Sequence, residues 1–325
     1  MTDPAPETHL SPLRFAVYLV VAVVAGMLVA LQSRINGGLG QALDDGFVAA
    51  IISFGSGAVL LSLLLLLWRP GRRGVVRTVS AIREGGIPWW YVLGGLGGAI
   101  FVLSQGLLVG ILGVALLTVG IVSGQTLSSL LVDRRGLGTM RPKPITAPRL
   151  VGAVLALVAV GIAVSGELRA AVPLWIVIEP FLVGLLLGVQ QALNGQVRSV
   201  SQSAVTATWA NFVVGAAVLL VAALIHLPFA GWPTHWSTNP LLYLGGPVGM
   251  LFIGMQAAIV RQMGVLVMGL AVLAGQLATS VLLDVLLPLP GHVIAVTTVI
   301  GTVLTFVAVA VASVRFRASR ATPAP

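Results

Sequence analysis

The sequence LQSRINGGLG, at residues 31–40, ends a strongly apolar stretch with polar residues and a cluster of glycines. A related sequence, VQQALNGQVR, stands at residues 189–198. Both contain a glutamine, an asparagine four residues later and then a glycine. Because the two copies are separated by about half of the 325 residues, the pattern indicates a duplicated unit that makes up most of the chain.

The composition indicates an integral membrane protein. Hydrophobic residues make up 58% of the chain and charged residues only 8%, whereas soluble domains carry about 25% charged residues. So few charges cannot cover the surface of a soluble protein of this size, so lipid is the expected solvent. The net charge of +9 comes from basic residues in short segments between apolar runs. That distribution orients membrane proteins, and no nucleic-acid partner is expected.

Apolar runs of about 20 residues predict ten membrane-spanning helices. They are expected near residues 13–36, 47–68, 89–110, 113–132, 148–166, 173–195, 204–227, 241–260, 264–286 and 291–314. Turn-forming and charged sequences separate most of these runs. The third and fourth runs are barely separated, around Gly110 and Gly113.

The basic residues predict how the chain is oriented in the membrane. With ten spans, 16 of the 18 lysines and arginines fall on one side, and only Arg34 and Arg169 fall on the other. Basic residues collect on the cytoplasmic side, so both termini are expected in the cytoplasm of a multi-pass protein of the inner membrane. The five arginines that follow the second span are expected in a cytoplasmic loop; they are Arg69, Arg72, Arg73, Arg77 and Arg83.

The duplication extends over both halves of the chain. Adding 158 carries the Q-x-x-x-N-G pattern of residues 32–37 onto residues 190–195, and adding 151 carries residues 94–133 onto residues 245–284 without a gap. Each half has five spans, and an odd number makes the second half enter the membrane from the opposite side. Inverted repeats of this kind recur in secondary transporters, where the substrate site lies at the repeat interface.

We therefore expect an all-α integral membrane protein in which ten transmembrane helices form two inverted five-helix repeats. The expected organisation is an N-terminal cytoplasmic tail (1–12), a first repeat (13–166), a second repeat (167–314) and a C-terminal cytoplasmic tail (315–325).

The duplicated Q-x-x-x-N-G at the end of the first span of each half, with a G-Q…D pattern in the fourth span, resembles the YdcZ-like family of the drug/metabolite transporter (DMT) superfamily. The resemblance covers residues 13–314. It implies a ten-helix inner-membrane permease with an EamA-like arrangement, often described as an exporter, whose substrate is generally unassigned. In this chain Gln196 stands where the first half has Gly38, so the second glycine cluster is thinner.

Uncharged amides at membrane depth are the candidate substrate ligands. The glutamine and asparagine of each Q-x-x-x-N-G pattern share a helix face. They can bind a polar substrate or hydrogen-bond neighbouring helices, and both alternatives stay open. Further glutamines nearer mid-membrane favour a cavity lining. The candidate set is Gln32, Asn36, Gln105, Gln125, Gln190, Asn194, Gln256 and Gln276.

Three charged residues are candidates for coupling transport to protons. Glu179 lies inside a predicted span and precedes Pro180, which predicts a broken or kinked helix. Arg34 is the only basic residue expected at a similar depth, so the two form a candidate titrating pair; the alternative is an interfacial glutamate that reaches water. Asp284, at the end of the ninth span, is the next candidate.

Several kinds of chemistry are not expected. The chain has no cysteine, which excludes disulfides and thiol catalysis. The four histidines are expected in a tail or outer loops without metal-ligand spacing, so neither a metal site nor another cofactor is predicted. No phosphate-binding loop for ATP is present.

The sequence thus predicts a secondary transporter, an exporter of a small organic solute or metabolite that works by alternating access, and not an enzyme. The alternative is a membrane-embedded enzyme or flippase that acts on a lipid-linked substrate. The nine acidic residues are scattered, which disfavours the enzyme. The expected partners are a small-molecule substrate, membrane lipid and protons, in a monomer or homodimer.

Overall fold

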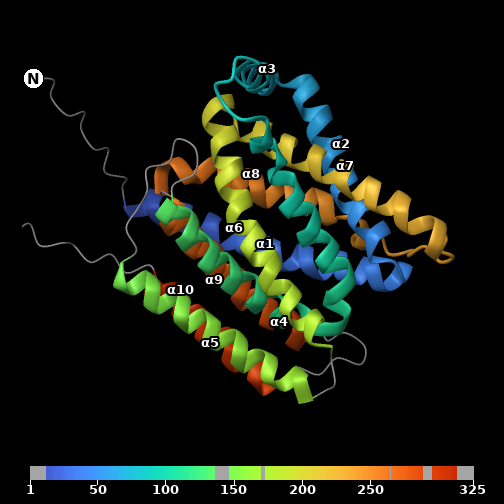
Figure 1. The fold of residues 1–325 in the computed structure, drawn as a ribbon, viewed down its shortest axis with the longest axis vertical. Helices are drawn as coiled ribbons and strands as arrows, with labels where there is room; N and C mark the ends of the chain where they lie inside the picture. The colour runs from blue at the N-terminus through green and yellow to red at the C-terminus, as the bar shows by residue number, and fades with distance from the viewer. Residues whose placement is uncertain (1–11, 136–145, 170–172, 264, 288–294, 313–325) are drawn as a thin grey trace, which may run out of the picture.

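The computed structural model describes residues 12–135, 146–169, 173–263, 265–287 and 295–312. Regular structure in these residues is entirely helical. This is expected in lipid, where the N–H and C=O groups of the backbone have no water to bond and pair with each other inside a helix. Most of the two predicted tails lies outside the described residues. The α-helices, seen in Figure 1, are α1 (Pro12–Leu43), α2 (Gly46–Leu67), α3 (Arg69–Arg83), α4 (Gly95–Arg135), α5 (Ala147–Arg169), α6 (Leu174–Ser201), α7 (Ala204–Ala230), α8 (Gly245–Met263), α9 (Val265–Leu286) and α10 (Val296–Ala312), with 3-10 turns η1 (Trp89–Gly94) and η2 (Pro240–Tyr243).

Half of the described α-helices are long and apolar enough to cross a membrane. Five described segments have the length and hydropathy of a membrane span: Leu13–Leu43, Gly46–Leu67, Trp89–Val132, Leu174–Ser201 and Ala204–Ala230. Shorter apolar helices lie at Leu150–Ala163, Ala271–Leu286 and Val296–Val311. The segment Trp89–Val132 has 44 residues, about twice what one crossing needs. It therefore has to contain two spans.

The two spans inside α4 are separated at Gly113. This residue has φ 74° and ψ 168°, which a residue with a side chain rarely adopts, and α4 changes direction part-way along its length (Figure 1). Before the break, Ser104 hydrogen-bonds Glu179 of α6. After it, Gly120 packs on the adjacent Pro180. Positions on either side of Gly113 thus meet the same part of α6, so the two arms of α4 run back alongside each other.

The same relation holds farther from the break. Gly98 of the first arm lies against Gln190, and Ser128 of the second arm lies against Gly188. The third and fourth predicted spans are therefore these two arms. With α1, α2 and α5–α10 they give the ten spans that the sequence predicts.

Helix α3 is an addition that the sequence analysis placed in a loop. Gly71, Gly74 and Thr78 are buried along one face, where the backbone packs on the start of α7. There the hydroxyl of Thr206 donates a 2.9 Å hydrogen bond to the carbonyl of Gly71. The expectation of a loop was wrong. It rested on the many arginines of this segment and did not consider that Gly71, Gly74 and Thr78 have the spacing of one helix face.

Some predicted boundaries also move. α1 continues to Leu43, so the first Q-x-x-x-N-G pattern lies within a helix and not at its end. Within this helix Gly37 packs directly on Val109 of α4. α5 extends to Arg169, three residues past the predicted end of the fifth span at residue 166.

Equivalent residues of the two halves make equivalent contacts where α2 meets α7. Phe54 of α2 stacks on Phe212 of α7, with ring centroids 4.8 Å apart. Each ring also covers a glycine of the opposite helix: Phe212 covers Gly57, and Phe54 covers Gly215. Because adding 158 exchanges both pairs, this contact lies on the pseudo-two-fold axis between the repeats.

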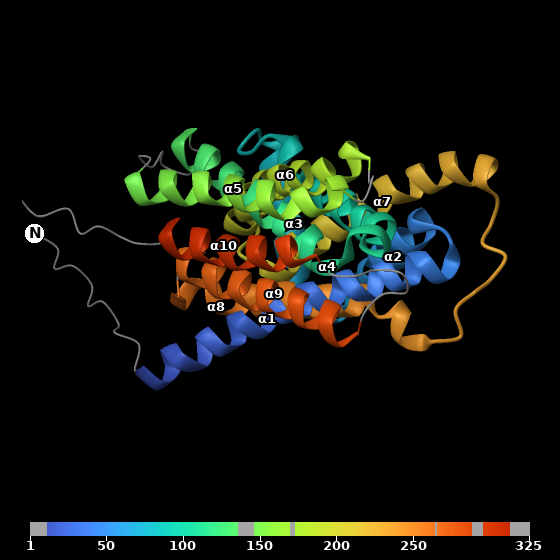
Figure 2. The same ribbon diagram turned by 90° about the horizontal axis from the view of Figure 1, so that it is seen from below.

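Glycines also bring the first helix of each repeat onto the fourth helix of the other. Gly26 of α1 and Gly275 of α9 each face a backbone carbonyl of the opposite helix. Gly184 of α6 and Gly124 in the second arm of α4 do the same. The offsets of 158 and 151 relate the two crossings, which confirms the inverted five-helix repeats. The fifth helices, α5 and α10, pack together on one flank (Figure 2).

The glycine crossings predict a strong steric effect. A side chain at Gly275 would collide with the carbonyl of Val23, whereas Gly269 on the same helix faces open space. We expect Gly275→Val to lower stability by about 1–3 kcal/mol, the usual cost of overpacking, and Gly269→Val to have little effect. Thermal unfolding of the purified protein in detergent measures both. Equal unfolding temperatures would show that α1 and α9 are not in backbone contact.

Candidate functional site

The amides of the first repeat form a closed hydrogen-bonded cluster between α1 and the first arm of α4. The side-chain nitrogen of Asn36 donates to Gln105 Oε1 at 2.6 Å. Gln105 Nε2 donates to Ser33 Oγ at 2.7 Å. Asn36 and Gln105 are both 0% exposed. In this conformation these side chains join two helices and are not open to solvent.

Helix α8 also contacts this cluster. Gln32 Nε2 donates to the carbonyl of Gly245 at 2.8 Å, and Asn36 Oδ1 lies against the same glycine. That Oδ1 atom is buried and has no hydrogen-bond partner. A buried amide oxygen without a donor costs free energy, so the first cluster is sealed but not fully satisfied.

The amides of the second repeat sit in a related setting on α6. Asn194 Oδ1 accepts a 3.1 Å hydrogen bond from Asn211 of α7. Asn194 lies against Gly94 and Gln190 against Gly98. In the first repeat Asn36 lies against Gly245 and Gln32 against Gly249; the offset of 158 relates the amides of the two clusters and the offset of 151 relates the glycines. The Oε1 atom of Gln190 is buried without a hydrogen-bond partner.

The two clusters also differ in the packing against the third helix of their repeat. In the first repeat Gly37 packs on Val109 of α4. Its equivalent, Gly195, is exposed and has no atom near the position of a side chain. In the described part of the chain, α6 and α8 show no packing comparable with that of α1 and α4. Gln256 of α8, the equivalent of Gln105, is accordingly partly exposed.

The remaining two glutamines lie at the glycine crossings. The backbone of Gln125 faces Gly184 of α6, and that of Gln276 faces Gly26 of α1. The side chain of Gln276 is buried, whereas that of Gln125 is partly exposed. Both positions adjoin the repeat interface, and the expectation that they line a cavity stays a prediction.

Glu179 bonds a hydroxyl on the first arm of α4. Its Oε2 atom accepts a 2.8 Å hydrogen bond from Ser104 Oγ, and the carboxylate is partly buried. Of the break or kink expected at Pro180, the break is absent, since α6 is one helix from Leu174 to Ser201; the kink stays a prediction. The ring of Pro180 packs on Gly120, which holds this part of α6 against the second arm of α4.

Arg34 does not contact Glu179 among the described residues. Its guanidinium donates a 2.8 Å hydrogen bond to the carbonyl of Leu287 and lies within electrostatic range of Asp284. The structure therefore brings together two of the three residues predicted for coupling and leaves Glu179 apart from them. Depth along the helices suggested the Glu179 pairing, but depth does not specify which helices are neighbours.

Asp284 caps the second arm of α4. Its carboxylate accepts hydrogen bonds from the backbone nitrogens of Val114 at 3.0 Å and Ala115 at 2.6 Å, and it is only 3% exposed. The first amides of a helix have no partner inside the helix, and a carboxylate is a favoured acceptor there. The capping residue is 169 positions away from Ala115, so no local sequence pattern signals it.

A polar contact between Asp45 and His226 was not predicted from the sequence. Asp45 caps α2 by accepting bonds from Phe47 and Val48, and its second oxygen lies 3.2 Å from His226 Nε2. The histidine ring stacks on Phe47 at 4.3 Å. His226 is thus part of α7, and the expectation that it lies in an outer loop was wrong. Among the described residues, no cluster of three or more residues could hold a metal ion.

Comparison with known protein families shows to which family the chain belongs. The profile of the family described as "Putative inner membrane exporter, YdcZ" (DMT_YdcZ) matches residues 17–163 and 174–311. The chain belongs to this family. The two matched segments correspond to the two repeats of the structure, which confirms the predicted family, the DMT superfamily and a multi-pass protein of the inner membrane.

Two other comparisons add to this result. Among curated proteins there is no match. A solved structure described only as "Crystal structure of protein" is similar over 93% of this chain and 97% of its own length, with a TM-score of 0.53 and 18% sequence identity. At that identity the likeness shows the fold alone.

The contacts of Asp284 predict a structural role in this DMT_YdcZ protein. Asp284→Asn keeps the shape but removes the charge that meets two backbone amides and Arg34. We expect a loss of stability on the order of 1 kcal/mol, as for other helix caps. Thermal unfolding in detergent measures it, with the exposed Asp44→Asn as the control for loss of one charge. Adding Arg34→Gln should recover part of the loss, because the pair is then removed together.

Proposed function

We propose that this protein is a secondary transporter that exports a small organic solute by alternating access between its two inverted repeats. The observation that supports this most is the difference between two equivalent sites. The amide cluster of α1 is sealed by the first arm of α4, whereas its counterpart on α6 lacks the corresponding packing by α8. The exporter family to which the chain belongs supports the direction.

A pseudo-symmetric protein gives a direct route between two conformations. If the two repeats exchange arrangements, α8 closes on α6 and the first arm of α4 leaves α1. The closed side would then open and the open side would close. Substrate bound near the repeat interface would pass from one side to the other without a continuous pore.

The positions of the basic residues indicate which end of the protein faces the cytoplasm. The open end of α6 is the end that carries α3, because α3 packs on Ser203 and Thr206, directly after α6. The arginine-rich α3 side is cytoplasmic by the positive-inside rule. The conformation described here is therefore open toward the cytoplasm, and both termini lie there. An exporter takes up its substrate in this state.

The side chains around the open site favour a neutral, polar substrate. Gln190, Asn194 and Gln256 provide amide donors and acceptors without charge. The Oε1 atom of Gln190 is buried without a hydrogen-bond partner in this conformation. Once a side-chain rotation exposes it, it would accept a hydrogen bond from a hydroxyl, amide or amine of the solute. A thermal-shift screen against neutral polar metabolites would identify such a ligand, since binding to the native state raises the unfolding temperature.

Single cysteines test the two-sided arrangement, because the chain contains none. Gln191 is exposed on α6, and its equivalent on α1, Ser33, is 1% exposed. We expect a membrane-impermeant maleimide to label Gln191→Cys from the cytoplasmic side of inverted vesicles and to leave Ser33→Cys unlabelled from that side. Ligands that favour the opposite state should protect Gln191→Cys from the reagent and should make Ser33→Cys accessible to it from the outer side of the membrane. Labelling of Gln191→Cys only from the outside would contradict both the orientation and the state.

Glu179 is the proposed coupling residue. Its partner Ser104 precedes Gln105, which bonds Asn36 of the sealed cluster. One short segment of α4 thus joins the carboxylate to the cluster that has to open during the cycle. Protonation of Glu179 would weaken the hold on this segment, because a neutral carboxyl is a poorer acceptor than a carboxylate.

The Glu179 assignment predicts a specific loss. In vesicles with an imposed pH gradient, Glu179→Gln should reduce gradient-driven transport at least tenfold, while exchange of substrate across the membrane continues. Ser104→Ala, which removes the partner and keeps the carboxylate, should have a smaller effect. If Glu179→Gln transports normally under a pH gradient, the carboxylate does not couple transport and Asp284 is the next residue to test.

A further inference from the structure

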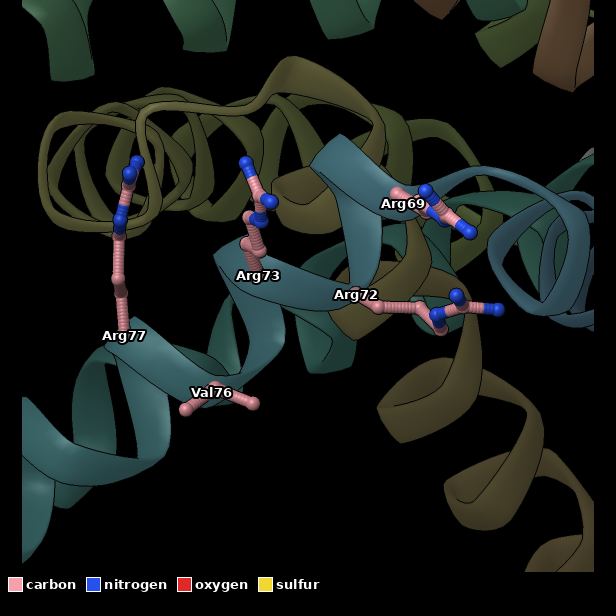
Figure 3. Close-up of a pocket in the computed structure, with 5 residues that line it drawn as sticks. All are labelled: Arg69, Arg72, Arg73, Val76 and Arg77. Atoms are coloured by element: carbon pink, nitrogen blue, oxygen red, sulfur yellow. The ribbon is translucent and has the colours of Figure 1, made fainter.

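The arginines of α3 surround a hollow at the surface of the protein. Arg69, Arg72, Arg73 and Arg77, with Val76 between them, line a volume of about 560 Å³. Figure 3 shows the four guanidinium groups extending from successive turns of α3. All four side chains are exposed. In the described part of the chain, no acidic side chain forms an ion pair with any of them.

The position of α3 is fixed by its opposite face. Gly71, Gly74 and Thr78 are buried, and Gly74 lies against Thr206 of α7 and against Ser203, the N-cap of that helix. A side chain at either glycine would push α3 off its neighbours. The arginines are therefore held on a docked helix, which reduces the entropy that a ligand has to offset on binding.

Apolar side chains adjoin the charges. Val76 lines the hollow and is 65% exposed. Val79 on the same helix is exposed, as are Trp68 and Leu67 directly before α3; Leu67 is the last residue of the membrane-spanning α2. A basic face next to exposed apolar side chains and a tryptophan is typical of a helix that lies at the membrane surface.

These features together fit one class of ligand. We propose that the hollow on α3 binds the phosphate headgroup of an anionic phospholipid, with its acyl chains along Val76 and the end of α2. Arginine forks match phosphate oxygens, and clusters of basic residues beside a membrane span attract anionic lipids. A free phosphate would satisfy the arginines but would leave Val76 and its apolar neighbours exposed to water.

The test uses the full chain, purified in detergent and titrated with phosphatidylglycerol or phosphatidylcholine. We expect phosphatidylglycerol to raise the unfolding temperature and phosphatidylcholine to have little effect. Arg73→Gln with Arg77→Gln should weaken the phosphatidylglycerol response about tenfold. The matched pair Arg134→Gln with Arg135→Gln, exposed at the end of α4, should respond like the unchanged protein. Arg73→Lys with Arg77→Lys should retain part of the response, because the charge stays and the guanidinium fork is lost; this separates lost charge from misfolding.

Three outcomes would overturn the proposal. Equal responses to both lipids would show that charge is not recognised. Equal losses in the α3 pair and the α4 pair would show a diffuse attraction without a site. Competition by millimolar inorganic phosphate would identify a site for free phosphate in place of a lipid. Lipid binding at α3 does not require transport, so this proposal and the transport mechanism can fail separately.

Discussion

Backbone contact at two glycine crossings is the constraint on which the rest of the structure depends. Where α1 meets α9 and where α4 meets α6, glycines on both helices face carbonyls of the other. Lipid tails are as apolar as the side chains of these helices, so association relies on close packing and not on the hydrophobic effect. A methyl group at either crossing would separate the helices. Each crossing ties one repeat to the other, so the glycines hold the two halves together.

The crossings also decide which parts of the molecule can differ between the halves. The contacts at Gly26, Gly275, Gly124 and Gly184 are equivalent in the two repeats, as is the stacked pair Phe54 and Phe212. The ends of α1 and α6 are not equivalent, because one is packed on its third helix and the other is not. Alternating access needs this combination of a constant centre and ends with two arrangements.

The sequence carried the repeats, the spans and the amide positions because all three follow from periodicity and composition. Gln32 with Asn36, and Gln190 with Asn194, could be placed on shared helix faces from their spacing alone. The structure adds which helix each face meets. Asp284 could not be assigned as the cap of Val114, nor Arg34 as a neighbour of Asp284, because those contacts join distant segments through tertiary packing.

Helix α3 was missed for a different reason: its arginines identified a polar segment between two spans, but charge alone does not distinguish a loop from a surface helix. The spacing of Gly71, Gly74 and Thr78 is meaningful only when a partner such as Thr206 is known.

The unpaired amide oxygens bear on how the two conformations can coexist. Asn36 Oδ1 in the sealed cluster and Gln190 Oε1 in the other are both buried without a hydrogen-bond partner. Each costs roughly 1–3 kcal/mol relative to a satisfied group. If every polar group of the sealed cluster had a hydrogen-bond partner, the free energy of this conformation would fall relative to that of the other. Because each repeat keeps one orphaned acceptor, neither arrangement gains a large advantage, and a ligand that donates a hydrogen bond to one of them can shift the balance.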